Sequence, residues 1–162
     1  MPAKAARRSG STPKLIDRYG ADTVRLYTMF AAPPEQSLEW SDSAVEGAFR
    51  FLRSLWRMTH EHVARGPVEG LDGMALDAAQ QTLRRKIHET IAKVTDDVSR
   101  RYKFNTAIAS VMELVNALAK APQDTAADRA VLHEGLTTCT LLLAPIVPHC
   151  TEAMWTALGN AT

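Results

Sequence analysis

The stretch LRRKIHETIAKVTDDVSRRYKFNTAIASVMELVNAL, residues 83–118, contains two helical patterns separated by a charged turn. Apolar side chains recur every three or four residues in its first part, and a second set follows YKFN, with Asn105 as the expected N-cap. A helix of about seven turns must bury such a face against neighbours, so the stretch predicts a helical bundle. The first set is Leu83, Ile87, Ile91, Val94, Val98 and Tyr102, and the second is Ile108, Val111, Met112, Val115 and Leu118.

Further helical patterns precede this stretch. Residues 14–30, KLIDRYGADTVRLYTMF, predict two helical pieces that break near Gly20. Ser43 and Glu46 have the spacing of a capping box, and behind them the sequence predicts a helix that ends near residue 64. The apolar face of this helix contains Val45, Phe49, Leu52, Leu55, Trp56, Thr59 and Val63.

Two helices are predicted after the stretch. Thr125 and Asp128 again have capping-box spacing, and they precede a helix whose second half is apolar nearly all round. That composition is expected of the central helix of a bundle. Pro145 and Pro148 interrupt the pattern, and a short last helix is expected to end with Gly159 at the position after its C-cap.

Together these patterns predict an all-α fold, an antiparallel helical bundle with a short N-terminal connector arm. We expect the arm and connector in residues 1–42 and the bundle in residues 43–162. The sequence has no repeat of fixed period and almost no alternating β pattern, which argues against solenoids and sheets. Such an architecture by itself names no function.

Composition and cysteine usage narrow the class of protein. The chain has 162 residues, of which 46% are hydrophobic and 23% charged, as is typical of one folded domain. No window approaches eighteen consecutive apolar residues, and the basic N-terminus has no apolar segment behind it, so we expect a cytoplasmic protein without a membrane partner. Cys139 and Cys150 lie among aliphatic residues, and we expect both to be buried, reduced thiols.

The sequence contains no motif of a known catalytic site, and we assign no catalytic and no metal-binding residue. It has no Gly-rich nucleotide loop, no nucleophile elbow and no H-E-x-x-H zinc motif. We interpret the five histidines as surface or hydrogen-bonded residues, and His88, His133 and His149 each stand alone. Asp96 and Asp97 diverge by about 100° on a helix, so we expect a solvated pair that bonds to nearby arginines rather than a proton-sharing pair.

Basic residues form three groups that suit a polyanion. The first group falls at i, i+3 and i+7, which aligns three guanidinium groups along one helix in the geometry of a phosphate ladder. A solvated surface and a nucleic-acid contact both stay open for these groups, and we interpret Tyr102 and Phe104 as lids over the core rather than base-stacking platforms. The candidate contacts are Arg50, Arg53, Arg57, Arg84, Arg85, Lys86, Arg100, Arg101 and Lys103.

Three segments in order span residues 15–159: LIDRYGADTVRLYTMFAAPPEQSLEWSDSAVEGAFRFLRSLWR, RRKIHETIAKVTDDVSRRYKFNTAIASVMELVNAL and LLLAPIVPHCTEAMWTALG. They resemble the region that follows the KMSKS loop in leucyl-tRNA synthetases of the bacterial type. EWSDSAVEG and KVTDDVSRRYKFNTAIASVMEL favour the leucyl enzymes. The related bundles of the valyl, isoleucyl and methionyl enzymes match more loosely and stay an alternative.

This resemblance implies a connector near the tRNA acceptor stem and a class I synthetase anticodon-binding bundle, which we expect to be truncated at its C-terminus. The implied partners are tRNA, with tRNA-Leu expected, and the missing catalytic domains of the parent enzyme. The parent would use ATP and Mg to activate leucine and would transfer it to tRNA. Upstream of Leu15 the chain lacks the KMSKS loop, and it has no HIGH motif, so we predict no cofactor in this chain and no activity of the chain alone.

Two other function classes stay open. The chain could retain some leucine activation, which a pyrophosphate exchange assay would detect. It could instead be an interaction module that docks on other domains and binds RNA feebly. In that case Leu38, Trp40 and Val45 would be interface residues that are exposed in this chain. Independently of this hypothesis, apolar surface exposed where the missing domains sat would allow some self-association.

Overall fold

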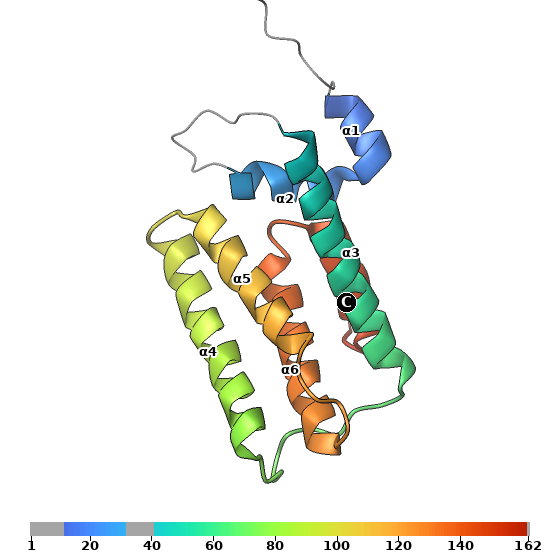
Figure 1. Ribbon diagram of the computed structural model, residues 1–162, viewed down its shortest axis with the longest axis vertical. Coiled ribbons are helices and arrows are strands. Elements are labelled where there is room, and N and C mark those ends of the chain that lie inside the picture. Colours follow the sequence, from blue (N-terminus) through green and yellow to red (C-terminus); the bar gives the residue numbers. More distant parts are fainter. Residues whose placement is uncertain (1–11, 32–40, 162) are drawn as a thin grey trace, which may run out of the picture.

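The computed structural model describes residues 12–31 and 41–161, and every regular element in these two ranges is an α-helix (Figure 1). The predicted all-α antiparallel bundle is confirmed. No helix in the described ranges is long and apolar enough to cross a membrane. In chain order the helices are α1 (Thr12–Tyr19), α2 (Ala21–Ala31), α3 (Asp42–Ala64), α4 (Ala78–Ser99), α5 (Phe104–Leu118), α6 (Ala126–Leu143) and α7 (Pro148–Ala157).

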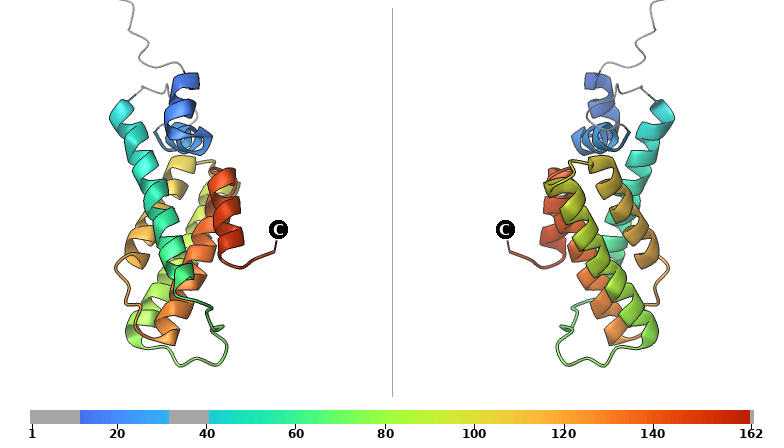
Figure 2. Two further views of the ribbon diagram at one scale, coloured as in Figure 1. Left: turned by 90° about the vertical axis from the view of Figure 1, so that its right-hand side faces the viewer. Right: turned by 90° about the vertical axis from the view of Figure 1, so that its left-hand side faces the viewer.

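Helices α3 to α6 run alternately along the long axis of the molecule, and the short helices α1 and α2 lie at one end of it (Figure 2). α4 packs against α5 and α6, whereas α3 packs against α2 and α7. Leu26 and Tyr27 of α2 are fully buried and belong to the same core as the bundle helices. Helix α2 therefore covers the bundle core at this end of the molecule.

The break between α1 and α2 lies at Gly20, as predicted. Gly20 has a φ of +82°, and its N–H donates to the carbonyl of Ile16 at 2.8 Å. This left-handed conformation is inexpensive for glycine and strained for other residues, so it stops one helix and allows the next to start in a new direction.

The start of α3 differs from the prediction, because Ser41 and not Ser43 is the N-cap. The Ser41 hydroxyl accepts the N–H of Ala44 at 3.4 Å, and the Ser41 N–H donates to the hydroxyl of Tyr27 at 3.1 Å. Ser43 lies inside the first turn with its Oγ 3.0 Å from that of Ser41. A tertiary contact with a buried tyrosine thus selects between two serines that are equally good caps by sequence.

The corner between α4 and α5 corrects three predictions. α4 ends at Ser99, so its apolar face stops at Val98 and does not reach Tyr102. Tyr102 has a φ of +52° and is 65% exposed, so it is not a lid over the core. α5 starts at Phe104, so Asn105 lies inside the helix and does not cap it. The Lys103 N–H returns to the Asp97 carbonyl at 2.8 Å, and this bond turns the chain early.

The second half of the bundle follows the sequence closely. Thr125 and Asp128 form the predicted capping box of α6, and Gly159 follows the C-cap of α7 with a φ of +87°. α4 has a further capping box, Asp77 with Gln80, that the sequence analysis missed. Cys139 and Cys150 are free thiols, as expected, but only Cys139 is fully buried.

A candidate nucleic-acid interface

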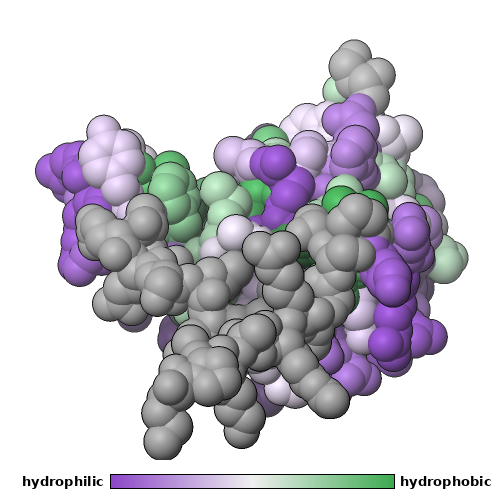
Figure 3. Space-filling view, turned by 90° about the horizontal axis from the view of Figure 1, so that it is seen from above, coloured by the Kyte–Doolittle hydropathy of each residue, from purple (hydrophilic) through white to green (hydrophobic). Residues whose placement is uncertain are grey.

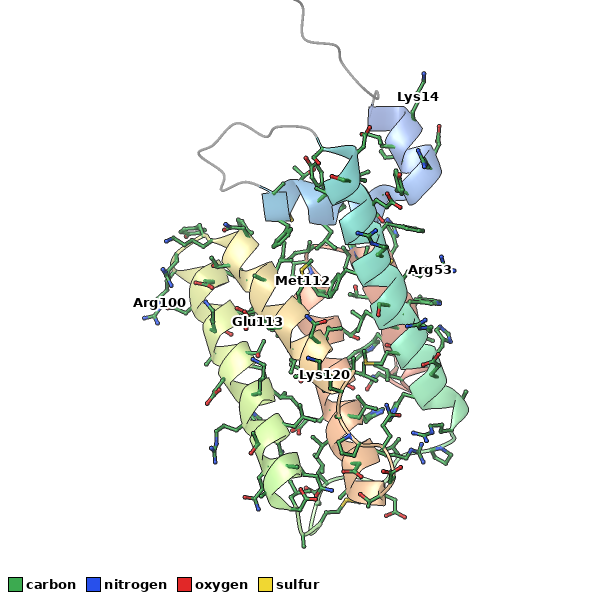
Figure 4. The ribbon with its side chains drawn as sticks, in the orientation of Figure 1. Lys14, Arg53, Arg100, Met112, Glu113 and Lys120 are labelled. Atoms are coloured by element: carbon green, nitrogen blue, oxygen red, sulfur yellow. The ribbon has the colours of Figure 1, made fainter. Side chains whose placement is uncertain are left out.

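The nine predicted contact residues do not form one surface. Arg53 on α3 and Arg100 after α4 extend from opposite sides of the bundle (Figure 4). Seen from above, hydrophilic residues gather on both flanks of the molecule with hydrophobic residues between them (Figure 3). The structure therefore separates the cations of α3 from those of α4 and of the α4–α5 corner, and each group has its own electrostatic surroundings.

The α3 group is the least engaged of the three. Arg50, Arg53 and Arg57 are all exposed, and their spacing of three and four residues aligns them along the helix. Arg57 lies 3.8 Å from Glu61, but both side chains are more than 70% exposed, so water and salt weaken that pair. Among the described residues, no carboxylate lies within ion-pair distance of Arg50 or Arg53.

The group at the start of α4 is tied to neighbouring helices. Arg84 Nε donates to Glu134 Oε2 of α6 at 2.9 Å, and Arg84 Nη2 donates to Oε1 at 3.3 Å. Lys86 Nζ lies 3.7 Å from Glu113 of α5. Arg84 thus holds α4 against α6, and Arg85, which is exposed and has no carboxylate partner in the described part of the chain, is the member left for a ligand.

The corner group surrounds a buried carboxylate. Asp97 has no exposed surface, and it accepts hydrogen bonds from Lys93 at 3.0 Å, Arg101 at 3.1 Å and Thr106 at 2.7 Å. Burial alone would raise the pKa of Asp97, but the hydrogen bonds of Thr106 and Lys93 and the charges of Lys93 and Arg101 outweigh it and lower the pKa.

The expectation of a solvated Asp96–Asp97 pair is therefore right only for the partly exposed Asp96, which pairs with Arg100. It is wrong for Asp97. The sequence could not distinguish the two carboxylates, because only the packing of α5 against α4 covers one of them. Arg101 consequently has a structural partner, while the side chain of Lys103 is exposed.

An apolar groove of about 460 Å³ opens beside the α3 group. We call it the Asp22 groove, and its walls include Tyr19, Asp22, Phe49, Arg53, Trp56 and His149. Trp56 is 39% exposed, so it lies outside the core face on which the sequence placed it. Its ring lies 4.4 Å from that of His60 on the same helix. RNA-binding surfaces combine arginines with aromatic rings, and the exposed face of α3 carries both.

Asp22 was not among the predicted site residues. Its Oδ2 accepts the backbone N–H of Cys150 at 2.6 Å, so a residue of α2 caps the first turn of α7. The two residues are 128 positions apart, so no local sequence pattern predicts their contact. Asp22 is 5% exposed, and Oδ1 has no N–H or O–H donor among the described residues.

A second polar cluster joins α3 to α6. His62 Nε2 lies 3.2 Å from His133 Nδ1, so His133 does not stand alone as predicted. Burial, then the charges of His133, Arg129 and Arg65, lower the pKa of His62 to about 4. Across residues 12–31 and 41–161, no three His, Cys, Asp or Glu side chains gather in a way that could hold a metal ion.

The interaction-module hypothesis named three interface residues. Val45 is fully buried in the core, so it cannot be an exposed interface residue. Leu38 and Trp40 lie outside the described residues. Exposed apolar side chains do occur elsewhere, and among them Phe30 and Trp56 line two different grooves.

Sequence comparison places the bundle among known proteins. The family model described as "Anticodon-binding domain of tRNA ligase" matches residues 80–162. The leucine–tRNA ligase of Alkalilimnicola ehrlichii is 65% identical over 96% of this chain, and that of Halorhodospira halophila is 59% identical over 97%. The chain covers only 18% and 20% of these two proteins.

Structure comparison agrees. A leucyl-tRNA synthetase of Agrobacterium radiobacter K84, solved in a ternary complex with tRNA and LeuAMS, matches 99% of this chain and 21% of its own with a TM-score of 0.82 and 26% identity. The methionyl-tRNA synthetase of Mycobacterium tuberculosis in its free state matches with a TM-score of 0.71 over 96% of this chain and 36% of its own. At 19% identity, the latter likeness shows the fold alone.

Proposed function

This chain belongs to the family of anticodon-binding domains of tRNA ligases, and from that premise we propose that it docks on the folded body of a tRNA through the exposed face of α3. The observation that carries the proposal is the row of Arg50, Arg53 and Arg57, which is exposed along one helix and almost free of carboxylates. Guanidinium groups bind phosphates through two hydrogen bonds at once, so such a row suits an RNA backbone.

We further propose tRNA-Leu as the partner and a leucine–tRNA ligase as the parent protein. The high identity with two bacterial leucine–tRNA ligases supports the leucyl type, whereas the methionyl enzyme supports only a shared fold. The parent would activate leucine with ATP and Mg and transfer it to the tRNA. This chain would position the tRNA and would take no part in the chemical steps. Its own contacts would therefore govern tRNA affinity and KM, and pyrophosphate exchange with ATP and leucine should stay at background.

Charge reversal tests the proposal. The triple variant R50E/R53E/R57E should bind a tRNA-Leu transcript at least tenfold more weakly in a filter-binding or fluorescence-anisotropy titration. Each phosphate contact releases counterions from the RNA, and this release makes the affinity depend on salt. When three contacts are lost, the slope of log affinity against log salt concentration should become less steep by about 2 to 3. Unchanged affinity in the triple variant would remove α3 as the docking face.

A matched pair of single variants controls for net charge. Arg53→Glu and Lys120→Glu change the total charge equally, but Lys120 lies beyond the end of α5 and on a different part of the surface (Figure 4). Arg53→Glu should weaken tRNA binding several-fold more than Lys120→Glu. Equal losses in both variants would mean that tRNA senses only the overall charge of the protein.

A further inference from the structure

We propose that the loop between α3 and α4, residues 65–77, contains a site of spontaneous covalent modification, at which the bond between Asp72 and Gly73 rearranges through a cyclic succinimide to isoaspartate. Asp72 is the only aspartate or asparagine of the 162 residues that a glycine follows. The loop lies at the opposite end of the bundle from α1 and α2 (Figure 1). The reaction needs no bound RNA, so it is independent of the proposed function.

The rearrangement needs a free side-chain carboxyl and a free backbone N–H on the next residue. The nitrogen of Gly73 attacks Cγ of Asp72 and forms a new C–N bond, and the side-chain hydroxyl leaves as water with the proton of that nitrogen. A second water then opens the ring at the former backbone carbonyl, which leaves Gly73 attached through the side chain of Asp72. One water leaves and one enters, so the net change is an isomerisation that requires no oxidant, reductant or further reactant.

The structure leaves both reacting groups of the loop unengaged. Asp72 and Gly73 are the exposed central residues of a turn that one backbone bond closes, from the Met74 N–H to the Leu71 carbonyl at 3.1 Å. In the described part of the chain, the Asp72 carboxylate has no donor and the Gly73 N–H has no acceptor. The nitrogen can therefore approach the carboxyl after the loss of a single hydrogen bond.

The conformation of the turn selects the residue that makes it reactive. Gly73 is the third residue of the turn and has a φ of +78°. A positive φ at this position strongly favours glycine. A side chain on the attacking residue would crowd the ring as it forms, and glycine has none. A Cβ at position 73 would meet nothing within 4 Å, so the surroundings also leave room for the ring.

The other aspartates of the described ranges are held by the fold. Most of them lie within helices, where the backbone dihedrals would have to leave the helical range before a ring could close. Asp77 and Asp124 precede helices, and capping boxes protect them. Asp77 Oδ1 accepts the N–H of Gln80 at 2.8 Å. The N–H that follows Asp124 belongs to Thr125 and donates to Asp128 Oδ2 at 3.0 Å.

Isoaspartate changes the covalent length of the loop. The main chain gains one methylene group at position 72, and a carboxylate is attached directly to it. Leu71 and Leu76 flank the site and are partly buried against the core. The turn beside Leu71 is therefore expected to open in the modified chain, whereas the helices keep their own hydrogen bonds.

The test ages the whole 162-residue chain at neutral pH and physiological temperature and then digests it with trypsin. Cleavage after Arg65 and Arg84 releases residues 66–84, a peptide that contains both Asp72 and Asp77. Electron-transfer fragmentation distinguishes aspartate from isoaspartate at each position. Isoaspartate should accumulate at position 72 at least tenfold faster than at position 77, with a transient species lighter by one water. No isoaspartate at position 72 after several weeks would overturn the proposal.

A matched variant separates the contribution of the structure from that of the sequence. Ala78→Gly, at the first residue of α4, places a glycine after Asp77 as well, so the same peptide then contains two aspartates with identical neighbours on their C-terminal side. In the folded chain, position 77 should still react at least fivefold more slowly than position 72, because Asp77 remains bonded to Gln80. In the isolated peptide the two rates should become similar. Equal rates in the folded chain would show that the turn offers Asp72 no special freedom.

Two further variants test the two reacting groups. Gly73→Ala should slow the reaction at least tenfold, but the positive φ strains alanine and can alter the turn. Asp72→Glu retains the glycine and the turn, and its longer side chain closes a six-membered ring much less readily. It should therefore abolish isomerisation at position 72 and leave the thermal unfolding of the bundle unchanged. Isomerisation that persists in Asp72→Glu would place the modified residue elsewhere and contradict the assignment.

Discussion

Thr106 of α5 donates a hydrogen bond of 2.7 Å to Asp97 of α4, and through it the two helices share one buried carboxylate. Lys93 and Arg101 donate to the same group from positions four residues before and after it on the chain. The charged corner between α4 and α5 is therefore organised around Asp97. Of the four basic residues around it, Lys93 and Arg101 have this structural task, Arg100 pairs with Asp96, and the side chain of Lys103 is exposed.

Asp97→Asn should destabilise the fold by about 2–4 kcal/mol, because the carboxylate is fully buried and each of its donors loses a charged acceptor. Asp96→Asn is the matched control, since the neighbouring carboxylate is partly exposed and, within the described ranges, pairs with Arg100 alone. It should cost less than about 1 kcal/mol. Urea unfolding followed by circular dichroism measures both values, and equal losses would refute the central role of Asp97.

Gly135 of α6 is required by close packing rather than by backbone conformation. A Cβ at this position would overlap the Leu118 side chain and lie 3.3 Å from Ile87 Cδ1, and both neighbours are fully buried. Gly135→Ala should therefore destabilise by about 1–3 kcal/mol despite the better helix propensity of alanine. Gly47→Ala in α3 meets nothing within 4 Å and should stabilise by about 0.5–1 kcal/mol. Thermal unfolding of the pair checks the contrast in sign.

The protein should lose stability on mild acidification because of His62. Its pKa is 6.5 in the unfolded chain and about 4 in the fold, so the unfolded state binds the proton first. The free energy of unfolding should be unaffected by His62 above pH 6.5, should fall as the pH drops from 6.5 towards 4, and should level off below. The difference between these two pKa values sets an upper limit of about 3 kcal/mol for this loss.

His62→Gln should flatten the pH dependence between 6.5 and 4, whereas His60→Gln, at an exposed position of the same helix, should not. His133 also has a pKa lowered by burial, so some dependence should persist in the His62 variant. The lowered pKa values of Asp97 and Asp128 act in a separate window, below their ordinary value of 3.8. An unchanged profile in His62→Gln would contradict the assignment.

Arg84 should stabilise the fold and should not contact the RNA. Arg84→Glu places two carboxylates opposite each other and should destabilise by about 1 kcal/mol, a value limited by the partial exposure of the pair. The double variant R84E/E134R should recover most of that loss. Its tRNA affinity should stay within twofold of the original protein. A loss of tRNA affinity that persists in the double variant would instead make Arg84 a phosphate contact.

The helices and several of their ends could be predicted because they depend on local sequence. The break at Gly20, the capping box of Thr125 with Asp128 and the stop at Gly159 each involve residues within a few positions of one another. One error arose where a distant residue chose among local options. Tyr27 selects Ser41 as the cap of α3 across 14 positions. The other error is local, because the Lys103 N–H bonds to the carbonyl of Asp97 in the last turns of α4 and ends the α4 face before Tyr102.

The candidate site was predictable only in part. The row of Arg50, Arg53 and Arg57 follows from spacing on one helix, and the structure leaves it exposed. The other cations looked equivalent to it in the sequence, but Glu134 occupies Arg84 and Asp97 occupies Arg101. No sequence pattern could supply these pairings, because the Arg84 partner lies 50 positions away and the burial of Asp97 depends on α5.

The sequence by itself determined the all-α architecture and the order of its helices, since apolar periodicity and capping act over one or two turns of chain. Tertiary structure alone decided which charges are free. It placed Asp22 against α7 across 128 positions, joined His62 to His133 and separated the basic groups onto different sides of the bundle. The physical reason is that burial and ion pairing depend on how helices pack against one another, and a linear pattern does not record which faces meet.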